Sequence, residues 1–346
     1  MQNAKGPRVQ TPSSLGEMRR IIAGFSLTVA VSSIAELGIA DHLAEGPKTA
    51  AALAALTGAN EDFLRRVLRY LASEGVFEER DGDIFALTER SVWLRSDVPG
   101  SLRPRAIFAG SQLNWTAWGF LPQSIRAGTS GIQLAFNESL FEYLKTHPDA
   151  AAIFNRFMAQ QTAASVEALL NSYDFRGIRE IVDVGGGHGA LVAGILKAHP
   201  EMRGILFDLP EVIATARTFL DRIGVSDRCK LVGGSFFSEV PAGSDLYVLK
   251  FILHDWPDDE CKQILNNCQK AMARDGTLLI VEHVLPEGKG PDFARFMDVN
   301  MLVLTAGGRE RTRQEFADLL NAAELQLKRL LFTPIGLRVL ECGSSA

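Results

Sequence analysis

Two groups of side chains in this sequence have the types and spacing that chemistry requires. Residues 183–189 read Asp-Val-Gly-Gly-Gly-His-Gly and stand where an apolar run gives way to a helical pattern. His254 follows another apolar run, and the carboxylates Glu282 and Glu310 come later in the chain. Glycine allows the backbone to approach a ligand closely, and histidine is suited to proton transfer near neutral pH. The sequence therefore indicates a ligand-binding loop and a general base.

The glycine segment is typical of a site for a nucleotide-like cofactor. It lies at the predicted carboxyl end of a strand, where open α/β sheets bind ligands. Gly185, Gly187 and Ala190 also satisfy the dinucleotide pattern G-x-G-x-x-G/A. Asp208 ends the next apolar run, where its carboxylate can accept hydrogen bonds from ribose hydroxyls. NAD and S-adenosylmethionine both carry a ribose, so these residues leave both cofactors open.

His254 is predicted on the ligand side of the sheet, where a general base would be needed, although a histidine alone at this position can equally be structural. Glu282 ends the next strand and is expected beside it. Glu310 precedes a helix and could also serve only as a charge that complements the helix dipole. A carboxylate that accepts the imidazole N–H fixes the tautomer and stabilises the imidazolium. We expect Glu282 to orient the His254 ring in this way.

The C-terminal half alternates short apolar runs with helical patterns, which is typical of βαβ units and a parallel sheet. Strands are expected at residues 181–184, 204–208, 230–233, 245–250 and 277–282, and helices at 190–199 and 211–223. A last pair of strands, 326–332 and 337–341, is expected as a hairpin on the edge of this sheet. The candidate site residues would then lie at the ends of parallel strands.

The N-terminal region follows a winged-helix layout. A helical pattern covers residues 15–43, a short helix follows at 49–56, and a longer helix begins after Asn60 and ends at Gly75. Residues 76–87 are expected as a hairpin. Winged helices often bind DNA. Residues 1–105, however, carry equal numbers of acidic and basic side chains, and the longer helix opens with Glu61 and Asp62. A DNA-binding regulator is therefore the weaker interpretation.

Composition fits a soluble globular protein of about two domains. The 346 residues are 47% apolar and 22% charged, with a net charge of −5, which provides no electrostatic footprint for a nucleic acid or an anionic membrane. The four cysteines form no C-x-x-C pair, and the six histidines show no metal-ligand spacing. We expect no metal site and a reducing, cytoplasmic setting.

One segment has the outline of a signal peptide. Arg19 and Arg20 precede an uncharged run from Ile21 to Ala35. The run begins too far from Met1, is shorter than the ~20 residues that span a bilayer, and leads into a continuing helical pattern. We expect instead a helix that is buried in a core or against a second subunit.

Taken together, these motifs resemble a known family. They are residues 183–189, the sequence Phe-Asp-Leu-Pro at 207–210, His-Asp-Trp at 254–256, Glu282, and Gly-Gly-Arg-Glu-Arg-Thr at 307–312. They occur in the same order in the caffeic-acid-type O-methyltransferases of plants and in their bacterial relatives that methylate polyketides, phenazines and similar metabolites. The resemblance covers about residues 15–341.

The resemblance implies an α/β fold with a class I methyltransferase Rossmann-like sheet, mostly parallel with a C-terminal antiparallel hairpin. It also implies an α-helical, winged-helix-like N-terminal domain that forms a homodimer and binds neither nucleic acid nor membrane. The expected divisions are a flexible tail at 1–14, the dimerisation domain at 15–105, a helical linker at 106–170 that contributes to the substrate pocket, and the S-adenosylmethionine-binding domain at 171–346.

Site residues follow from the resemblance position by position. The catalytic set is His254 as the base with Glu282 and Glu310 as its flanking carboxylates. Cofactor contacts are expected from Asp183, Gly185, Gly187, Asp208, Leu209, Ser235, Phe236 and Lys250. Acceptor contacts are expected from Phe154, Phe157, Met158, Gln161, Asp255, Asn300 and Met301. Ser235 stands where the family usually has an acidic residue that contacts adenine, so we expect a weaker or water-mediated adenine contact. Thr305 stands where the family has a hydrogen-bonding asparagine, so the acceptor cannot be copied from the plant enzymes.

The implied reaction transfers a methyl group from S-adenosylmethionine to a phenolic hydroxyl and leaves S-adenosylhomocysteine. A phenol has a pKa of about 10, so it needs a base at neutral pH. No metal is required. Three alternatives are S-adenosylmethionine-supported hydroxylation or decarboxylation on the same fold, the DNA-binding regulator, and an NAD-dependent dehydrogenase that rests on the glycine pattern alone.

Overall fold

The computed structural model describes residues 13–344 and divides the chain into two compact units, one ending at Asn114 and the other beginning at Trp115. Of the flexible tail predicted at 1–14, residues 1–12 lie outside the described residues. Helix α1 (Ser13–Glu36) already begins within the last two positions of that predicted tail.

The first unit contains the predicted winged-helix layout. Its elements are α1, α2 (Ile39–His42), β1 (Lys48–Thr49), α3 (Ala50–Thr57), α4 (Glu61–Ser73), β2 (Phe77–Arg80), β3 (Ile84–Leu87), η1 (Ser91–Leu94) and α5 (Arg103–Gly110). The hydroxyl of Thr49 and the side-chain oxygen of Asn60 cap α3 and α4 by accepting backbone N–H groups. The helix predicted at 15–43 is interrupted at Gly38, whose φ of 66° is left-handed. Strand β1, which pairs with β3, is only two residues long and was not predicted.

A small apolar core holds this unit together. Leu53, Leu64, Leu68, Phe77 and Phe85 are buried in one cluster. Each such side chain contributes about 1.5–3 kcal/mol on burial, whereas an exposed ion pair contributes about 0–1 kcal/mol. Packing of the α4 face therefore dominates the stability of the unit.

The arginines of α4 face carboxylates of their own unit. Arg65 pairs with Glu61 and Asp83, and Arg69 pairs with Glu79 and Asp83. These pairs reduce the positive charge that the helix could offer to a phosphate backbone.

Helix α1 exposes much of its apolar surface. The exposed apolar side chains of α1 are Leu15, Met18, Ile21, Ile22, Phe25 and Val29. By length and composition residues 14–36 could cross a membrane, but buried helices of soluble proteins and signal sequences meet the same criterion. A second protein surface would also cover such a face.

The second unit is a sheet with helices on both faces. Its first helices are α6 (Gln112–Gly119), which begins just before the boundary, α7 (Leu121–Ala127), α8 (Gly131–Phe136), α9 (Leu140–Thr146) and α10 (Pro148–Ser172). The strands are β4 (Glu180–Val184), β5 (Arg203–Asp208), β6 (Cys229–Gly233), β7 (Leu246–Lys250), β8 (Thr277–Glu282), β11 (Leu325–Phe332) and β12 (Arg338–Ser344). The later helices are α11 (Ala190–Ala198), α12 (Pro210–Ile223), η2 (Leu253–Asp255), α13 (Asp258–Ala271), α14 (Phe293–Leu304) and α15 (Arg313–Ala322).

Strand order in this sheet is β11-β12-β8-β7-β4-β5-β6. The five strands from β8 to β6 are parallel, and β12 lies antiparallel to β8 and β11. The predicted parallel sheet and its C-terminal hairpin are confirmed. A short parallel pair, β9 (Val284–Leu285) with β10 (Arg311–Thr312), was not predicted, because two-residue strands leave no periodic signal.

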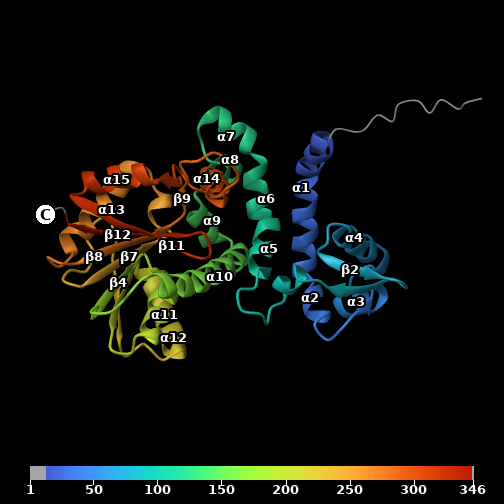
Figure 1. Ribbon diagram of the computed structural model, residues 1–346, viewed down its shortest axis with the longest axis horizontal. Helices are drawn as coiled ribbons and strands as arrows, with labels where there is room; N and C mark the ends of the chain where they lie inside the picture. The colour runs from blue at the N-terminus through green and yellow to red at the C-terminus, as the bar shows by residue number, and fades with distance from the viewer. Residues whose placement is uncertain (1–12, 345–346) are drawn as a thin grey trace, which may run out of the picture. The chain divides into compact units, whose positions relative to one another are not determined.

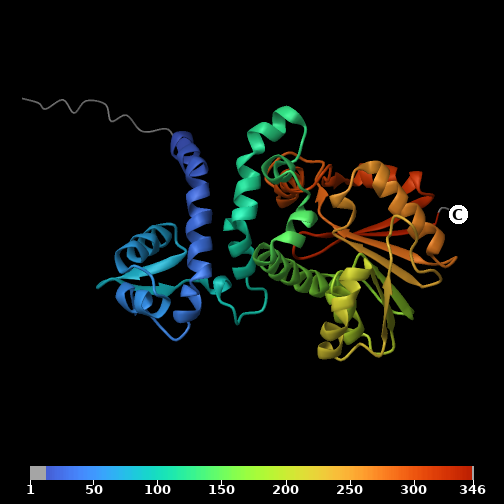
Figure 2. The same ribbon diagram turned by 180° about the vertical axis from the view of Figure 1, so that it is seen from behind.

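Alternating side chains explain the two helical layers. Along β4, Val182 and Val184 pack in one apolar cluster with α13 and α15, whereas Ile181 packs in another with α10, α11 and α12. Figure 1 and the reverse view in Figure 2 show α13 and α15 on one face of the sheet and α11 and α12 on the other.

This topology gathers the candidate residues at the carboxyl end of the parallel strands. The carboxyl ends of β4, β5, β7 and β8 are adjacent because these strands are parallel neighbours. The glycine segment follows β4, Asp208 ends β5, His254 follows β7 and Glu282 ends β8. Strand β10 pairs with β9 just beyond β8, which brings Glu310 to the same end of the strands.

Candidate active site

The glycine segment forms a close-packed loop between β4 and α11. A Cβ atom at Gly186 would lie 2.5 Å from the Asp183 carboxylate and 2.5 Å from Leu206 Cδ1, so only glycine fits there. At Gly187, φ is 61° and a Cβ would meet no atom within 4 Å. The loop therefore turns backbone toward open space, as a cradle for a bound group requires.

Asp208 closes one side of this cradle. Its Oδ2 accepts the Gly187 N–H at 2.7 Å, and its Oδ1 accepts the Leu209 N–H at 2.7 Å. Burial raises the pKa of Asp208, although these two N–H groups oppose the shift. Each carboxylate oxygen keeps a further lone pair, so the residue fits a ribose diol.

Asp183 and Lys250 lie behind the cradle. The Asp183 carboxylate is buried and accepts the Val192 N–H at 3.2 Å, and desolvation raises its pKa to about 7 while Lys250 opposes the shift. Lys250 donates to the Thr162 hydroxyl at 3.2 Å and lies over the Phe251 ring at 4.4 Å. Desolvation lowers the pKa of Lys250 to about 8, against the charges of nearby carboxylates.

The remaining expected cofactor residues lie around the same loop. A Cβ at Gly185 would be 3.4 Å from the Phe236 ring, so Phe236 borders the glycine segment. The ring of Phe236 contacts Phe237 and Trp256 edge-on. Ser235 accepts the Phe237 N–H at 3.3 Å, which uses its hydroxyl within its own turn. Leu209, directly after β5, is exposed.

His254 lies in η2 and is buried. Its Nδ1 is 3.0 Å from Glu310 Oε1, which leaves Nε2 as the nitrogen that can accept a proton. The Phe251 ring stacks on the imidazole at 5.3 Å. Phe251 has φ of 56°, a strained conformation for a bulky residue, and such strain is found where a site requires it.

Glu282 does not orient the imidazole, contrary to the expectation from the sequence. Its Oε1 accepts the backbone N–H groups of Ile252 at 3.1 Å and His254 at 3.2 Å. Among the hydrogen bonds of residues 13–344, the carboxylate partner of the His254 ring is Glu310. Sequence spacing places both carboxylates near the base but does not specify which one reaches the ring. Burial raises the pKa of Glu282 to about 7, while the charge of His254 opposes the shift.

The charges around His254 favour its imidazolium. Burial alone would lower the pKa of His254. The Asp255 charge, the hydrogen bond and charge of Glu310, and the Glu282 charge outweigh burial and raise the pKa to about 9. Asp255 Oδ1 lies 3.7 Å from Nε2. The cluster therefore holds a proton on this histidine firmly.

The expected acceptor residues lie on two helices that are tied to the site. Phe154, Phe157, Met158 and Gln161 fall on one face of α10. Helix α10 contacts the carboxyl end of β7, where Lys250 donates to the Thr162 hydroxyl.

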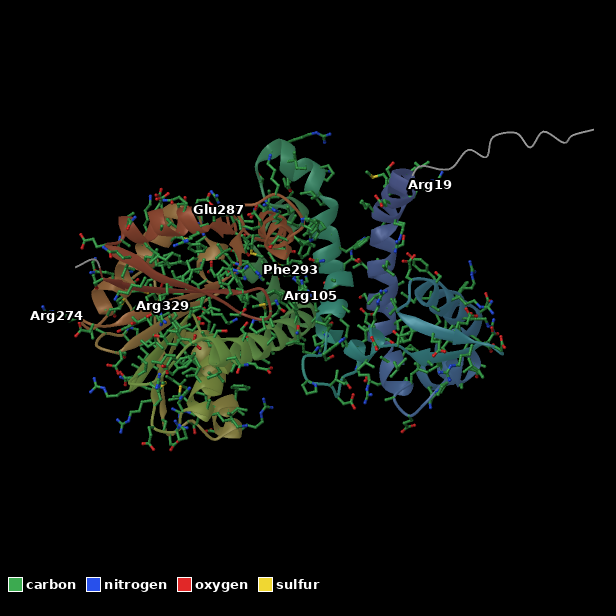
Figure 3. All side chains as sticks on the ribbon, viewed as in Figure 1. Arg19, Arg105, Arg274, Glu287, Phe293 and Arg329 are labelled. Carbon is green, nitrogen blue, oxygen red and sulfur yellow. The ribbon has the colours of Figure 1, made fainter. Side chains whose placement is uncertain are left out.

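The other acceptor helix, α14, carries Asn300 and the buried Met301. The Asp298 carboxylate of α14 accepts the Glu310 N–H at 3.0 Å. Phe293 lies at the start of α14 (Figure 3). Its ring centroid is 5.3 Å from that of His283. Thr305 donates its hydroxyl to the Met301 carbonyl at 2.8 Å, so that donor serves the end of the helix.

Known proteins resemble both units. Residues 118–326 match the model of an O-methyltransferase domain, and residues 20–97 match that of an O-methyltransferase dimerisation domain. A phenazine O-methyltransferase from Lysobacter antibioticus is 44% identical over 322 residues, covering 93% of this chain and 94% of the relative. A mitomycin biosynthesis 6-O-methyltransferase from Streptomyces lavendulae is 37% identical over 332 residues, covering 93% of this chain and 95% of the relative. A solved methyltransferase of calicheamicin biosynthesis with S-adenosylhomocysteine bound has a TM-score of 0.86 and 34% identity, covering 97% of this chain and 100% of that chain.

Proposed function

The chain belongs to the S-adenosylmethionine-dependent O-methyltransferase family, and on this basis we propose that it methylates a phenolic hydroxyl of an aromatic small molecule with His254 as the general base. The class I methyltransferase fold expected from the sequence is confirmed. One observation carries the proposal. A buried histidine, hydrogen-bonded to Glu310, stands at the same strand edge as the glycine cradle.

The proposed mechanism needs one proton transfer and accurate positioning. S-adenosylmethionine supplies a methyl group that its sulfonium has already activated. His254 Nε2 takes the hydroxyl proton of the acceptor, because Nδ1 is held by Glu310. The Glu310 carboxylate stabilises the imidazolium that forms. Within residues 13–344, no three His, Cys, Asp or Glu side chains are grouped to hold a metal, and the proposed steps use none.

We propose that the cradle and its surroundings hold the cofactor. The proposed contacts are Asp183, Gly185, Gly187, Asp208, Leu209, Ser235, Phe236 and Lys250. Asp183 supports the loop from beneath, since it is buried under Gly186. Asp208 is the proposed ribose ligand because its Oδ2 accepts the Gly187 N–H, which holds the carboxylate against the glycine loop.

The residues that we propose to contact the acceptor suit an aromatic ring. Phenylalanine and methionine side chains form an adaptable apolar slot for flat rings. The proposed acceptor contacts are Phe154, Phe157, Met158, Gln161, Asp255, Asn300 and Met301. The relatives named above act on a phenazine and in mitomycin biosynthesis, which supports an aromatic natural product as the substrate class.

The N-terminal region is proposed to form a homodimer. The match to a dimerisation domain over residues 20–97 supports this, and the exposed apolar face of α1 gives a second subunit a surface to cover. We propose the division into a dimerisation domain at 15–105, a linker at 106–170 and a methyltransferase domain at 171–346. We also propose that the enzyme is cytoplasmic and has no nucleic-acid or membrane partner.

Replacing Asp208 with alanine is expected to weaken binding of S-adenosylhomocysteine about ten- to hundredfold. Loss of charge-assisted hydrogen bonds costs about 1.5–3 kcal/mol, and the Gly187 N–H also loses its acceptor. Isothermal titration calorimetry measures the effect, with NADH titrated in parallel to test the dehydrogenase alternative. Asp221→Ala, at an exposed position of α12, is the control and should bind normally. Equal affinities in the two variants would remove Asp208 from the cofactor site.

The rate of methylation is expected to rise with pH as His254 loses its proton, with the midpoint of the rise at a pH of about 9. Only neutral imidazole accepts a proton, so kcat/KM for a weakly acidic phenol increases through this pKa. In Asp255→Asn, one anion that raises the pKa of His254 is gone, and the rising limb moves to lower pH. Asp259→Asn, whose carboxylate is on the surface of α13, is the control. A limb that stays in place in Asp255→Asn would contradict this electrostatic account.

A further inference from the structure

The turn that carries the proposed base is held by a buried arginine. Arg311 is fully buried, and its Nη1 donates to the Leu253 carbonyl at 2.9 Å. Its Nη2 donates to the Trp256 carbonyl at 2.8 Å. These two carbonyls belong to the first residue of η2 and to the residue that follows it, so they lie on either side of His254 in the chain. One guanidinium therefore fixes both ends of the turn.

Other groups show that this turn is tightly specified. Cys261 donates its thiol toward the same two carbonyls, at 3.2 Å and 3.4 Å. The Arg309 N–H donates to the His254 carbonyl at 2.8 Å. A Cβ at Gly308 would lie 2.5 Å from that carbonyl, which explains the glycine there.

Arg311 has its own carboxylate partner outside the turn. Its Nε and Nη2 both donate to Asp258 Oδ1, at 3.0 Å and 2.7 Å. A planar guanidinium with three sets of acceptors has one orientation, which lysine cannot reproduce because it lacks the rigid fork. The neighbouring residue, Glu310, holds the imidazole itself. Adjacent residues of one short segment thus fix the ring and the backbone of His254.

We propose that Arg311 is a positioning residue for methyl transfer, which acts by holding the η2 backbone so that His254 Nε2 meets the acceptor hydroxyl. This inference rests on the proposed role of His254 as the base. Misplacing a reacting group by about 1 Å costs on the order of a hundredfold in rate. The effect should appear only when a proton has to be removed, because an acceptor that is already ionised does not need the base.

The test compares two acceptors with Arg311→Lys. One is a phenol that the wild-type protein methylates, and the other is its nitro-substituted analogue, ionised at the assay pH. We expect turnover of the neutral phenol to fall about 10- to 100-fold, with KM for S-adenosylmethionine changed less than about twofold. Turnover of the ionised analogue should stay close to that of the wild type. Equal losses with both acceptors, or no loss with either, would overturn the inference.

Two further variants keep the test decisive. Arg228→Lys is the matched control, since Arg228 also donates to backbone carbonyls, those of Leu196, His199 and Met202, and lies before β6 at the amino end of the sheet. It should show no dependence on acceptor ionisation. Asp258→Ala removes only the carboxylate that anchors the Arg311 guanidinium. It should lower turnover of the neutral phenol selectively, by a smaller factor than Arg311→Lys. It therefore tests the inference even if Arg311→Lys does not fold.

The His254 and Arg311 variants give different results depending on whether the proposed function or only the role of Arg311 is wrong. If His254→Ala loses no turnover of the neutral phenol, the base itself is wrongly assigned. If His254→Ala shows the selective loss and neither Arg311→Lys nor Asp258→Ala does, only the positioning role is overturned.

Discussion

His254→Ala is expected to lower kcat for a neutral phenol about 10²–10⁴-fold, the usual contribution of a general base. Affinity for S-adenosylhomocysteine should change less than about twofold, because the glycine cradle and Asp208 do not depend on the imidazole. Steady-state kinetics and calorimetry on the same preparation give the two quantities.

A matched histidine variant controls for effects on folding. His199 follows α11 at the amino edge of the sheet, away from the cradle, so His199→Ala should keep both turnover and cofactor affinity. If His254→Ala turned over a neutral phenol at the wild-type rate, the base would have to be another group. Loss of cofactor affinity together with turnover would assign His254 to binding instead.

Glu310→Gln is expected to lower kcat about 10²–10⁴-fold, and Glu282→Gln much less. The Glu310 carboxylate fixes the Nδ1–H tautomer and stabilises the imidazolium, and an amide supplies no charge for that purpose. Glu282 accepts two backbone N–H groups, which the oxygen of a glutamine can still accept. Kinetics with a neutral phenol therefore distinguish the two carboxylates. A larger loss in Glu282→Gln would restore the expectation from the sequence that Glu282 orients the ring.

Much of the fold could be predicted because its elements have regular patterns. The runs at 181–184 and 277–282 are apolar, bounded by turn residues and separated by helical periods, so strand, helix and parallel order follow. The hairpin at 76–87 and the cap at Asn60 are local signals of the same kind. The break at Gly38 and the two-residue strands β9 and β10 were missed, since their conformation depends on tertiary contacts.

The sequence predicts which residues lie close together in the site but not which of them form hydrogen bonds with one another. Strand ends place Asp208, His254 and Glu282 at one edge, because parallel strands share that edge. The carboxylate that bonds the His254 ring is Glu310. Its position depends on how closely the loop before α15 approaches η2, which the spacing of residues in the sequence does not predict. The burial of Arg311 was equally invisible, since an arginine in a charged motif is usually on the surface.

Methyl transfer itself is tested most directly by mass spectrometry of the acceptor. The protein is incubated with S-adenosylmethionine carrying a deuterated methyl group and with a panel of hydroxylated aromatic compounds. We expect an acceptor that gains one labelled methyl group on a hydroxyl oxygen, with one S-adenosylhomocysteine formed per product. An acceptor that gains oxygen or loses carbon dioxide without label would contradict this expectation.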